Sequence, residues 1–181
     1  MVTGANQGGK TTFARAVGQL HWLAVRGLPV PADSAQVAPC SSLHTHFERR
    51  EEVADARGKL EDELLRIHAI LEQTDARSLV IINEIFGSTT VADAQLLGRE
   101  VLTRLLATGA RGVVVTFLDE LAALDPAVVS MVAGVDAQDP ARRTFRVTRR
   151  PADGMAHALA LARRYGLTRE QISVRMREAR P

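Results

Sequence analysis

A glycine-rich run near the amino terminus has the residue types and spacing of a phosphate-binding loop. The run Gly4-Ala5-Asn6-Gln7-Gly8-Gly9-Lys10-Thr11 fits the pattern G-x-x-x-x-G-K-[ST] at every fixed position. Glycines allow successive backbone N–H groups to turn toward a phosphate, and the helix that follows directs its positive end at the same oxygens. In this pattern Lys10 contacts the β- and γ-phosphates and the Thr11 hydroxyl ligates Mg²⁺.

Lysine is scarce in this chain, which makes its presence in the loop informative. Of the 23 lysine and arginine residues, only Lys10 and Lys59 are lysine. The planar fork of an arginine is too bulky to act as a point charge on a phosphate, whereas an ammonium is compact. Lysine at position 10 therefore favours phosphate binding over the alternative, a glycine-rich turn that matches the pattern by chance.

A second set of candidate residues follows the apolar run 79–82. Asn83 and Glu84 end this run, and it is the only apolar run in the chain that ends with an acidic residue. A nucleotide hydrolase needs a site for Mg²⁺ and the attacking water at the carboxyl end of a strand neighbouring the phosphate loop. We expect Glu84 to act as general base and Asn83 to hold Mg²⁺ through water, more weakly than an aspartate would. The alternative for Glu84 is a capping or ion-paired surface residue.

These groups need a strand before the loop, a helix after it and a sheet that holds both sites. Continuous apolar runs separated by amphipathic segments are typical of parallel strands buried on both faces. We therefore predict an α/β fold, a mostly parallel sheet flanked by helices, in one domain of residues 1–181 with C-terminal helices within 155–178. Strands are expected at 1–3, 79–82, 112–116, 128–135 and 144–148, and helices at 11–25, 51–71, 91–106, 155–165 and 169–177.

Composition excludes several classes of protein. The 181 residues carry a net charge of +2 and only 4% aromatic residues, which argues against a free-standing nucleic-acid module. The single cysteine, Cys40, cannot form an internal disulfide. Because no apolar run is long enough to cross a membrane and no signal peptide is visible, we expect a cytoplasmic protein without membrane contact.

Four segments resemble the MutS family of DNA mismatch repair ATPases. Residues 3–12 (TGANQGGKTT) resemble that family's T-G-P-N-M-G-G-K-S-T loop, and residues 83–90 (NEIFGSTT) resemble its D-E-I-G-R-G-T-S segment. Residues 115–117 (VTF) are similar to the strand where the family has A-T-H. The tail from Asp153 resembles the family's closing segment, so the resemblance extends from Val2 to about Glu178.

The resemblance implies the carboxy-terminal ATPase domain of a MutS-like protein, with an ABC-type P-loop NTPase fold. It implies Mg²⁺-dependent ATP hydrolysis by a head-to-tail homodimer, in which ATP lies between one protomer's loop and its partner's signature segment. That segment would fall near residues 57–63, where Lys59 is either a contact to the partner's γ-phosphate or a solvated helix charge. DNA would be contacted only through other domains of a longer protein, of which this chain is a fragment.

The same resemblance assigns roles residue by residue. It implies that Glu84 is catalytic and that Thr11 and Asn83 hold Mg²⁺. Asn83, Phe117 and the missing signature serine depart from the family's pattern and suggest a MutS-related branch, with Thr116 or Ser88 contacting the γ-phosphate in place of the family's histidine. The residues expected to bind ATP are Gly4, Ala5, Asn6, Gln7, Gly8, Gly9, Lys10, Thr11 and Thr12.

Other functions remain open from the sequence. The chief alternative is a nucleotide-dependent dimerisation or scaffold module with little or no hydrolysis; a P-loop kinase would need an arginine-rich lid that we do not identify. Cys40, His44 and His46 suggest zinc binding only weakly, since three ligands fall short of a closed structural site. The arginines within 142–150 are expected to form a solvated face; the alternative is a contact with DNA phosphates or with another domain. Finally, no aromatic residue lies next to the glycine-rich run in the sequence to indicate where a base would stack.

Overall fold

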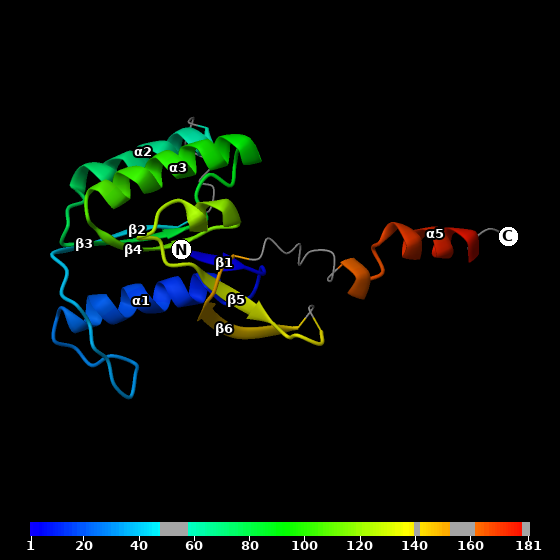
Figure 1. Ribbon diagram of the computed structural model, residues 1–181, viewed down its shortest axis with the longest axis horizontal. Helices are drawn as coiled ribbons and strands as arrows, with labels where there is room; N and C mark the ends of the chain where they lie inside the picture. Colours follow the sequence, from blue (N-terminus) through cyan, green and yellow to red (C-terminus); the bar gives the residue numbers. More distant parts are fainter. Residues whose placement is uncertain (48–57, 140–141, 153–161, 179–181) are drawn as a thin grey trace.

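The structure is a mixed α/β fold built on one six-stranded sheet (Figure 1). This computed structural model describes residues 1–47, 58–139, 142–152 and 162–178. The strands lie in the order β2-β3-β4-β1-β5-β6. Their bounds are β1 Val2–Gly4, β2 Ser42–His46, β3 Ser78–Asn83, β4 Arg111–Val115, β5 Met131–Val135 and β6 Arg143–Arg149.

The sheet is parallel except at one edge, as the apolar runs predicted. Strand β1 pairs in parallel with β4 and β5, and β3 pairs in parallel with β2 and β4. Only β6 runs antiparallel to its neighbour β5. Because β4 lies between β1 and β3, the expectation that the acidic strand adjoins the glycine-rich strand is wrong. The sequence does not reveal which strands are neighbours here, because two helices and an edge strand separate β1 from β3 along the chain.

Helices cover both faces of the sheet (Figure 1). On one face lies α1, Lys10–Ala24, and on the other lie α2, Lys59–Gln73, and α3, Val91–Ala107. A 3-10 helix, η1, spans Asp119–Ala123, and α5, Arg169–Glu178, lies apart from the sheet. The hydroxyl of Thr90 caps α3 by accepting from the backbone N–H of Asp93 at 3.2 Å, as N-terminal threonines commonly do.

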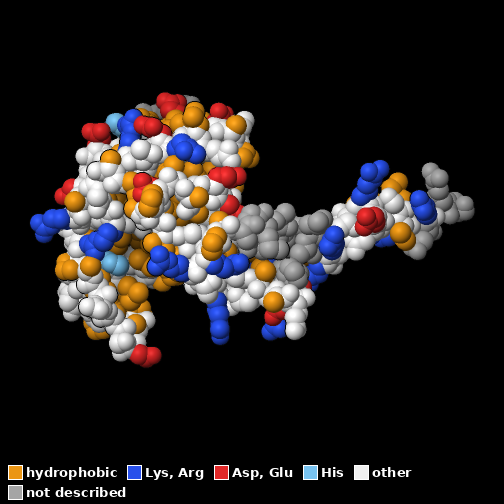
Figure 2. Space-filling view, viewed as in Figure 1, with side chains coloured by type: hydrophobic (Ala, Val, Ile, Leu, Met, Phe, Trp, Pro, Cys, Tyr) orange, Lys and Arg blue, Asp and Glu red, His pale blue; other side chains and the backbone are white. Residues whose placement is uncertain are grey.

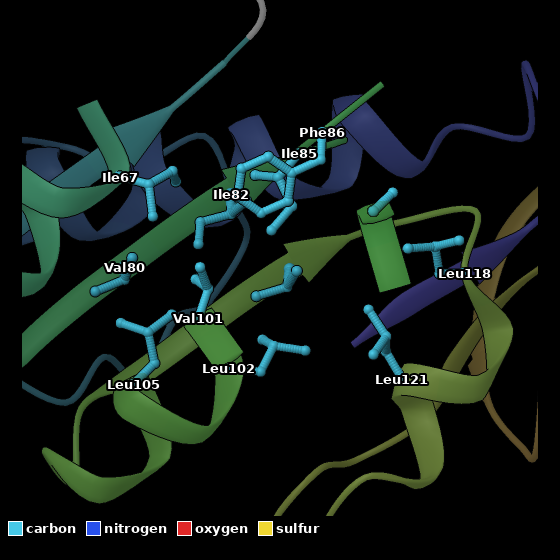
Figure 3. Packing of buried hydrophobic residues seen from close by; sticks show 12 residues of the cluster. Ile67, Val80, Ile82, Ile85, Phe86, Val101, Leu102, Leu105, Leu118 and Leu121 are labelled. Atoms are coloured by element: carbon cyan, nitrogen blue, oxygen red, sulfur yellow. The ribbon is translucent and has the colours of Figure 1, made fainter. Parts of the chain in front are cut away.

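The core is concentrated on the α2–α3 face (Figure 3). All six residues of β3 are buried; Val80 and Ile82 pack toward α2 and α3, while Leu79 and Ile81 join a smaller cluster with α1. On α3 the buried stripe runs through Val101, Leu102 and Leu105. Leu96, on the same helix, is 70% exposed.

Some predicted elements fall partly beyond the described residues. The sequence predicted a helix that begins at residue 51. Among the described residues α2 begins at Lys59, and residues 51–57 are not described. The helix predicted over 155–165 likewise overlaps the range 153–161, which is not described.

In the described part of the chain, no helix is long and apolar enough to cross a membrane. Acidic and basic side chains are interspersed on the face seen in Figure 2.

Candidate functional site

The glycine-rich loop, residues 4–11, links the end of β1 to the start of α1. Gly4 and Gly9 have φ angles of 98° and 93°, in the left-handed region that glycine enters without a Cβ penalty. A Cβ at Gly4 would lie 2.7 Å from the carbonyl oxygen of Ala133, so β5 leaves no space for a side chain there. The loop is therefore shaped by its glycines and by the strand packed beside it.

Lys10 sits at the centre of this loop and is only 4% exposed. Its ammonium donates to the carbonyl of Gly4 at 2.8 Å, to that of Ala5 at 3.3 Å and to Oδ1 of Asn6 at 3.3 Å. Burial lowers the pKa of Lys10; the charges of Glu84 and Asp119 counteract this effect, and that of Arg143 adds to it. A buried cation held only by neutral oxygens is a site at which an anion would be stabilised.

A pocket of about 380 Å³ opens over the loop. Glu84 reaches it from the end of β3, although β4 lies between the two strands. Of the residues predicted to bind ATP, six line the pocket, whereas Gly4, Ala5 and Gly8 are not among its lining residues. The lining consists of Asn6, Gln7, Gly9, Lys10, Thr11, Thr12, Glu84 and Phe145.

Glu84 is presented by the acidic turn, residues 83–87, which has an unusual backbone. Glu84 and Phe86 have φ angles of 53° and 60°, a region that residues with side chains rarely adopt. The backbone N–H of Glu84 donates to the carbonyl of Val115 on β4 at 2.9 Å. Phe86 is fully buried beside Ile85 and Ile82 (Figure 3). Tertiary contacts on both sides thus hold the strained turn in place.

A buried carboxylate braces the acidic turn from α2. Oε1 of Glu63 accepts from the backbone N–H of Phe86 at 2.8 Å and from Nε2–H of His46 at 3.3 Å. Burial would raise the pKa of Glu63, but these two hydrogen bonds and the charges of His46 and Arg66 together outweigh burial and lower its pKa below the ordinary value. No local sequence pattern predicts this contact, because its three members come from β2, α2 and the loop after β3.

Asn83 lies at the carboxyl end of β3 and is 7% exposed. Its side-chain oxygen Oδ1 is buried and has no hydrogen-bond partner among the described residues. An unpaired buried amide oxygen is costly, and a metal-bound water would satisfy it. Thr11 and Asn83 both offer the hard oxygen donors that Mg²⁺ prefers, but only Thr11 lines the pocket over the loop.

Two residues of β6 border the loop and were not anticipated. Nε of Arg143 donates to the carbonyl of Asn6 at 2.9 Å, across 137 residues of sequence. Phe145 lines the pocket and is 71% exposed. Arg143 therefore belongs to the loop's surroundings and not to a simple solvated face. Neither residue carries a local motif, so only the pairing of β6 with β5 reveals them.

The other residues that the sequence singled out as functional candidates are not among those that line this pocket. The Thr116 hydroxyl is buried and accepts from the backbone N–H of Leu118 at 3.0 Å, whereas Ser88 and Phe117 are exposed. His46 binds Glu63, and no group of three or more histidine, cysteine or acidic residues in the described ranges could hold a metal ion. The zinc interpretation thus finds no support there. The signature interpretation of 57–63 includes Arg57, outside the described residues.

Comparison with known proteins places the chain in a family. Residues 1–171 match the family described as MutS domain V. The chain belongs to this family. It is 32% identical to the protein named Endonuclease MutS2 of Thermomicrobium roseum over 98% of this chain and 23% of that protein. It is 29% identical to the protein of the same name from Brevibacillus brevis, over 96% of this chain and 22% of that protein.

A third relative comes from a plant. The mitochondrial DNA mismatch repair protein MSH1 of Arabidopsis thaliana is 32% identical to this MutS-family chain. The match covers 65% of this chain and 11% of that protein. The chain thus spans less than a quarter of the length of each of these three relatives.

Proposed function

We propose that this MutS-family chain binds ATP with Mg²⁺ and hydrolyses it, as a P-loop NTPase domain of the ABC type. The observation that carries the proposal is the pocket that Lys10, Thr11 and Glu84 line together. A buried ammonium in a glycine-rich loop favours a polyphosphate, and a carboxylate in the same pocket can take a proton from water. Neither group alone would indicate hydrolysis.

Each residue has a defined task in this proposal. Backbone N–H groups of the loop and the Lys10 ammonium bind the phosphates, and Glu84 orients the attacking water and accepts its proton. Thr11, and Asn83 through water, would hold Mg²⁺, which neutralises charge on the phosphates when bound. The brace from Glu63 keeps Glu84 directed at the pocket.

The proposal extends to assembly and to biological role. The resemblance in the sequence supports a head-to-tail homodimer through the nucleotide site, with residues near 57–63 of one protomer facing the other's loop. The names of the relatives, an endonuclease and a mismatch repair protein, support a role in DNA repair. We propose that ATP turnover in this domain controls a grip on DNA by other domains, in the cytoplasm.

A second candidate function is a nucleotide-dependent dimerisation module with little hydrolysis. Asn83 favours it, because an uncharged amide binds Mg²⁺ more weakly than a carboxylate. Glu84 in the pocket favours hydrolysis. The two candidates differ in one measurable quantity, the turnover of bound ATP.

The deciding experiment is ATP hydrolysis per protomer as a function of protein concentration, with Mg²⁺. We expect a rate that rises with concentration and falls by roughly a hundredfold or more in Glu84→Ala, the usual effect of removing a general base. Glu100→Ala, an exposed acidic residue on α3, is the matched control and should leave the rate unchanged. ATP binding without turnover in the wild type would favour the dimerisation module, and a rate independent of concentration would contradict the shared site.

A further inference from the structure

The carboxyl end of β4 lies between the glycine-rich loop and the acidic turn. Val115, the last residue of β4, is in register with Val2 of β1 on one side and with Asn83 of β3 on the other. The backbone N–H of Thr116 donates to the carbonyl of Val2 at 3.1 Å. The exit segment of β4, residues 116–119, therefore starts at the edge of the sheet that carries both sets of candidate residues.

Two buried leucines fix the position of this exit segment and of η1. Leu118 and Leu121 are each 3% exposed and belong to the core cluster on the α3 side (Figure 3). The backbone N–H of Leu118 also donates to the Thr116 hydroxyl at 3.0 Å, and η1 contacts both β1 and α3. Asp119 lies between these two leucines and is only partly exposed. The backbone that carries Asp119 is thus held beside β1 by core packing.

The charge of Asp119 acts on the buried ammonium of the glycine-rich loop. Burial lowers the pKa of Lys10, and the negative charges of Glu84 and Asp119 oppose this effect. Within the described ranges, the Asp119 carboxylate takes part in no ion pair. Its charge therefore acts at the phosphate-binding loop without being held by one particular basic side chain.

The neighbouring strand β3 ends in a residue that lacks such a charge. Asn83 is 7% exposed, and its Oδ1 is buried without a hydrogen-bond partner among the described residues. An amide oxygen can accept from a metal-bound water, but it is neutral, and so is the Thr11 hydroxyl. Magnesium sites in proteins usually include one or two carboxylates. Since Glu84 is assigned to the attacking water, a site built from Thr11 and Asn83 alone has no anionic ligand.

We propose that Asp119 supplies the carboxylate of the Mg²⁺ site and so provides the charge that Asn83 lacks. Its oxygens would act directly or through a metal-bound water, because Mg²⁺ keeps several of its waters. The inference rests on the proposed function, since it assumes a nucleotide bound with Mg²⁺. It adds a residue from η1 to a site whose other members come from α1 and β3.

The test compares the Kd of the 181-residue chain for a non-hydrolysable ATP analogue, adenylyl imidodiphosphate, with Mg²⁺ and with EDTA. In Asp119→Asn we expect the two constants to change in opposite directions. With Mg²⁺ the Kd should rise about tenfold, the lower end of the effect of removing a residue that supports a bound metal. In EDTA the Kd should fall, because a negative charge near the phosphates is removed. Glu120→Gln, which changes an exposed neighbour on η1, should alter neither constant.

A second variant returns a carboxylate to the neighbouring strand. Asn83→Asp in the Asp119→Asn background should restore most of the Mg²⁺ dependence, because one anionic ligand is again present. Mn²⁺ suits the same oxygen donors and is visible by electron paramagnetic resonance, which measures metal binding directly. With the analogue present, the bound fraction of Mn²⁺ should fall in Asp119→Asn and recover in the double variant. The single variant decides the inference even if the double variant, changed at a buried position, does not fold.

Two outcomes would overturn this inference alone. A Kd that changed equally with Mg²⁺ and in EDTA would show that Asp119 acts on Lys10 or on the phosphates and not through the metal. Unchanged constants and unchanged Mn²⁺ binding in Asp119→Asn would exclude its carboxylate from the site. If the wild-type chain did not bind the analogue in either condition, the proposed function itself would be refuted, and this inference with it.

Discussion

The pocket is formed by two turns with left-handed backbone, which reach that conformation by different means. In the glycine-rich loop two of the three left-handed positions are glycines, Gly4 and Gly9. In the acidic turn the left-handed positions are Glu84 and Phe86, both with full side chains. Glycine adopts positive φ without steric cost, whereas each non-glycine residue there needs compensation from its surroundings. The first turn is thus encoded locally and the second is imposed by tertiary contacts.

The contacts that impose the acidic turn can be named. The carbonyl of Val115 accepts from Glu84, the carboxylate of Glu63 accepts from Phe86, and the Phe86 ring is fully buried. By contrast, Gly4 of the loop is fitted against the backbone of β5. Substitutions should therefore damage the two turns differently: added volume should disrupt the loop, and loss of a distant partner should disrupt the acidic turn.

The largest effect on stability is expected from Gly4→Ala. Its new Cβ would meet the Ala133 carbonyl at 2.7 Å in a left-handed backbone, and neither backbone can yield easily. Strain and overpacking together should lower the free energy of unfolding by roughly 3 kcal/mol, measured by urea denaturation, and should abolish ATP binding. Gly87→Ala is the matched control, because nothing lies within 4 Å of a Cβ there. Similar losses in both variants would contradict the role of close packing at Gly4.

Removal of the brace should affect hydrolysis more than binding. In Glu63→Leu the buried N–H of Phe86 loses its acceptor, which should cost about 1–3 kcal/mol of stability. The turn should then misplace Glu84 and reduce single-turnover ATP hydrolysis by on the order of tenfold to a hundredfold, while the Kd for ATP stays within about twofold. Glu63→Gln should restore most of the rate, since its amide oxygen can still accept both hydrogen bonds.

The control for this prediction separates positioning from stability. Leu105→Ala leaves a cavity in the core cluster that also contains Phe86, with a loss of about 2–5 kcal/mol in general, but it removes no hydrogen bond of the turn. If Glu63→Leu and Leu105→Ala reduced hydrolysis equally, the role of Glu63 would be structural only.

The smallest effect concerns acid stability. Because the pKa of Glu63 in the folded state lies below its ordinary value of 4.5, folding favours the ionised carboxylate. Its contribution is complete above the unfolded pKa and is lost as the pH falls through the folded pKa. From about pH 5 to about pH 3, wild type should therefore lose more stability than Glu63→Gln does in urea denaturation. Glu61→Gln, which changes an exposed neighbour on α2, should lose stability with pH as the wild type does. If the wild type and both variants lost the same stability over this pH range, Glu63 would not contribute to acid stability.

Much of the fold could be predicted from short stretches of sequence. The apolar run 79–82 became a strand buried at every residue, because a strand covered by helices on both faces needs apolar side chains throughout. Which leucines of a helix are buried could not be predicted in this way. Leu96 and Leu105 both belong to the apolar set of α3, but only Leu105 is buried, because the packing of α3 on the sheet decides which side of a broad apolar stripe is covered.

The sequence by itself determined the glycine-rich loop, since glycine conformations and a neighbouring lysine act within a few residues, and it determined the buried strands and the family. Only the tertiary structure decided that β4 separates β1 from β3, that Glu63 braces the acidic turn and that Phe145 lies at the pocket. These features join residues far apart in the chain, and their positions depend on strand order and on the pairing of β6 with β5. Local residue preferences do not specify either, because they arise only when the whole sheet is assembled.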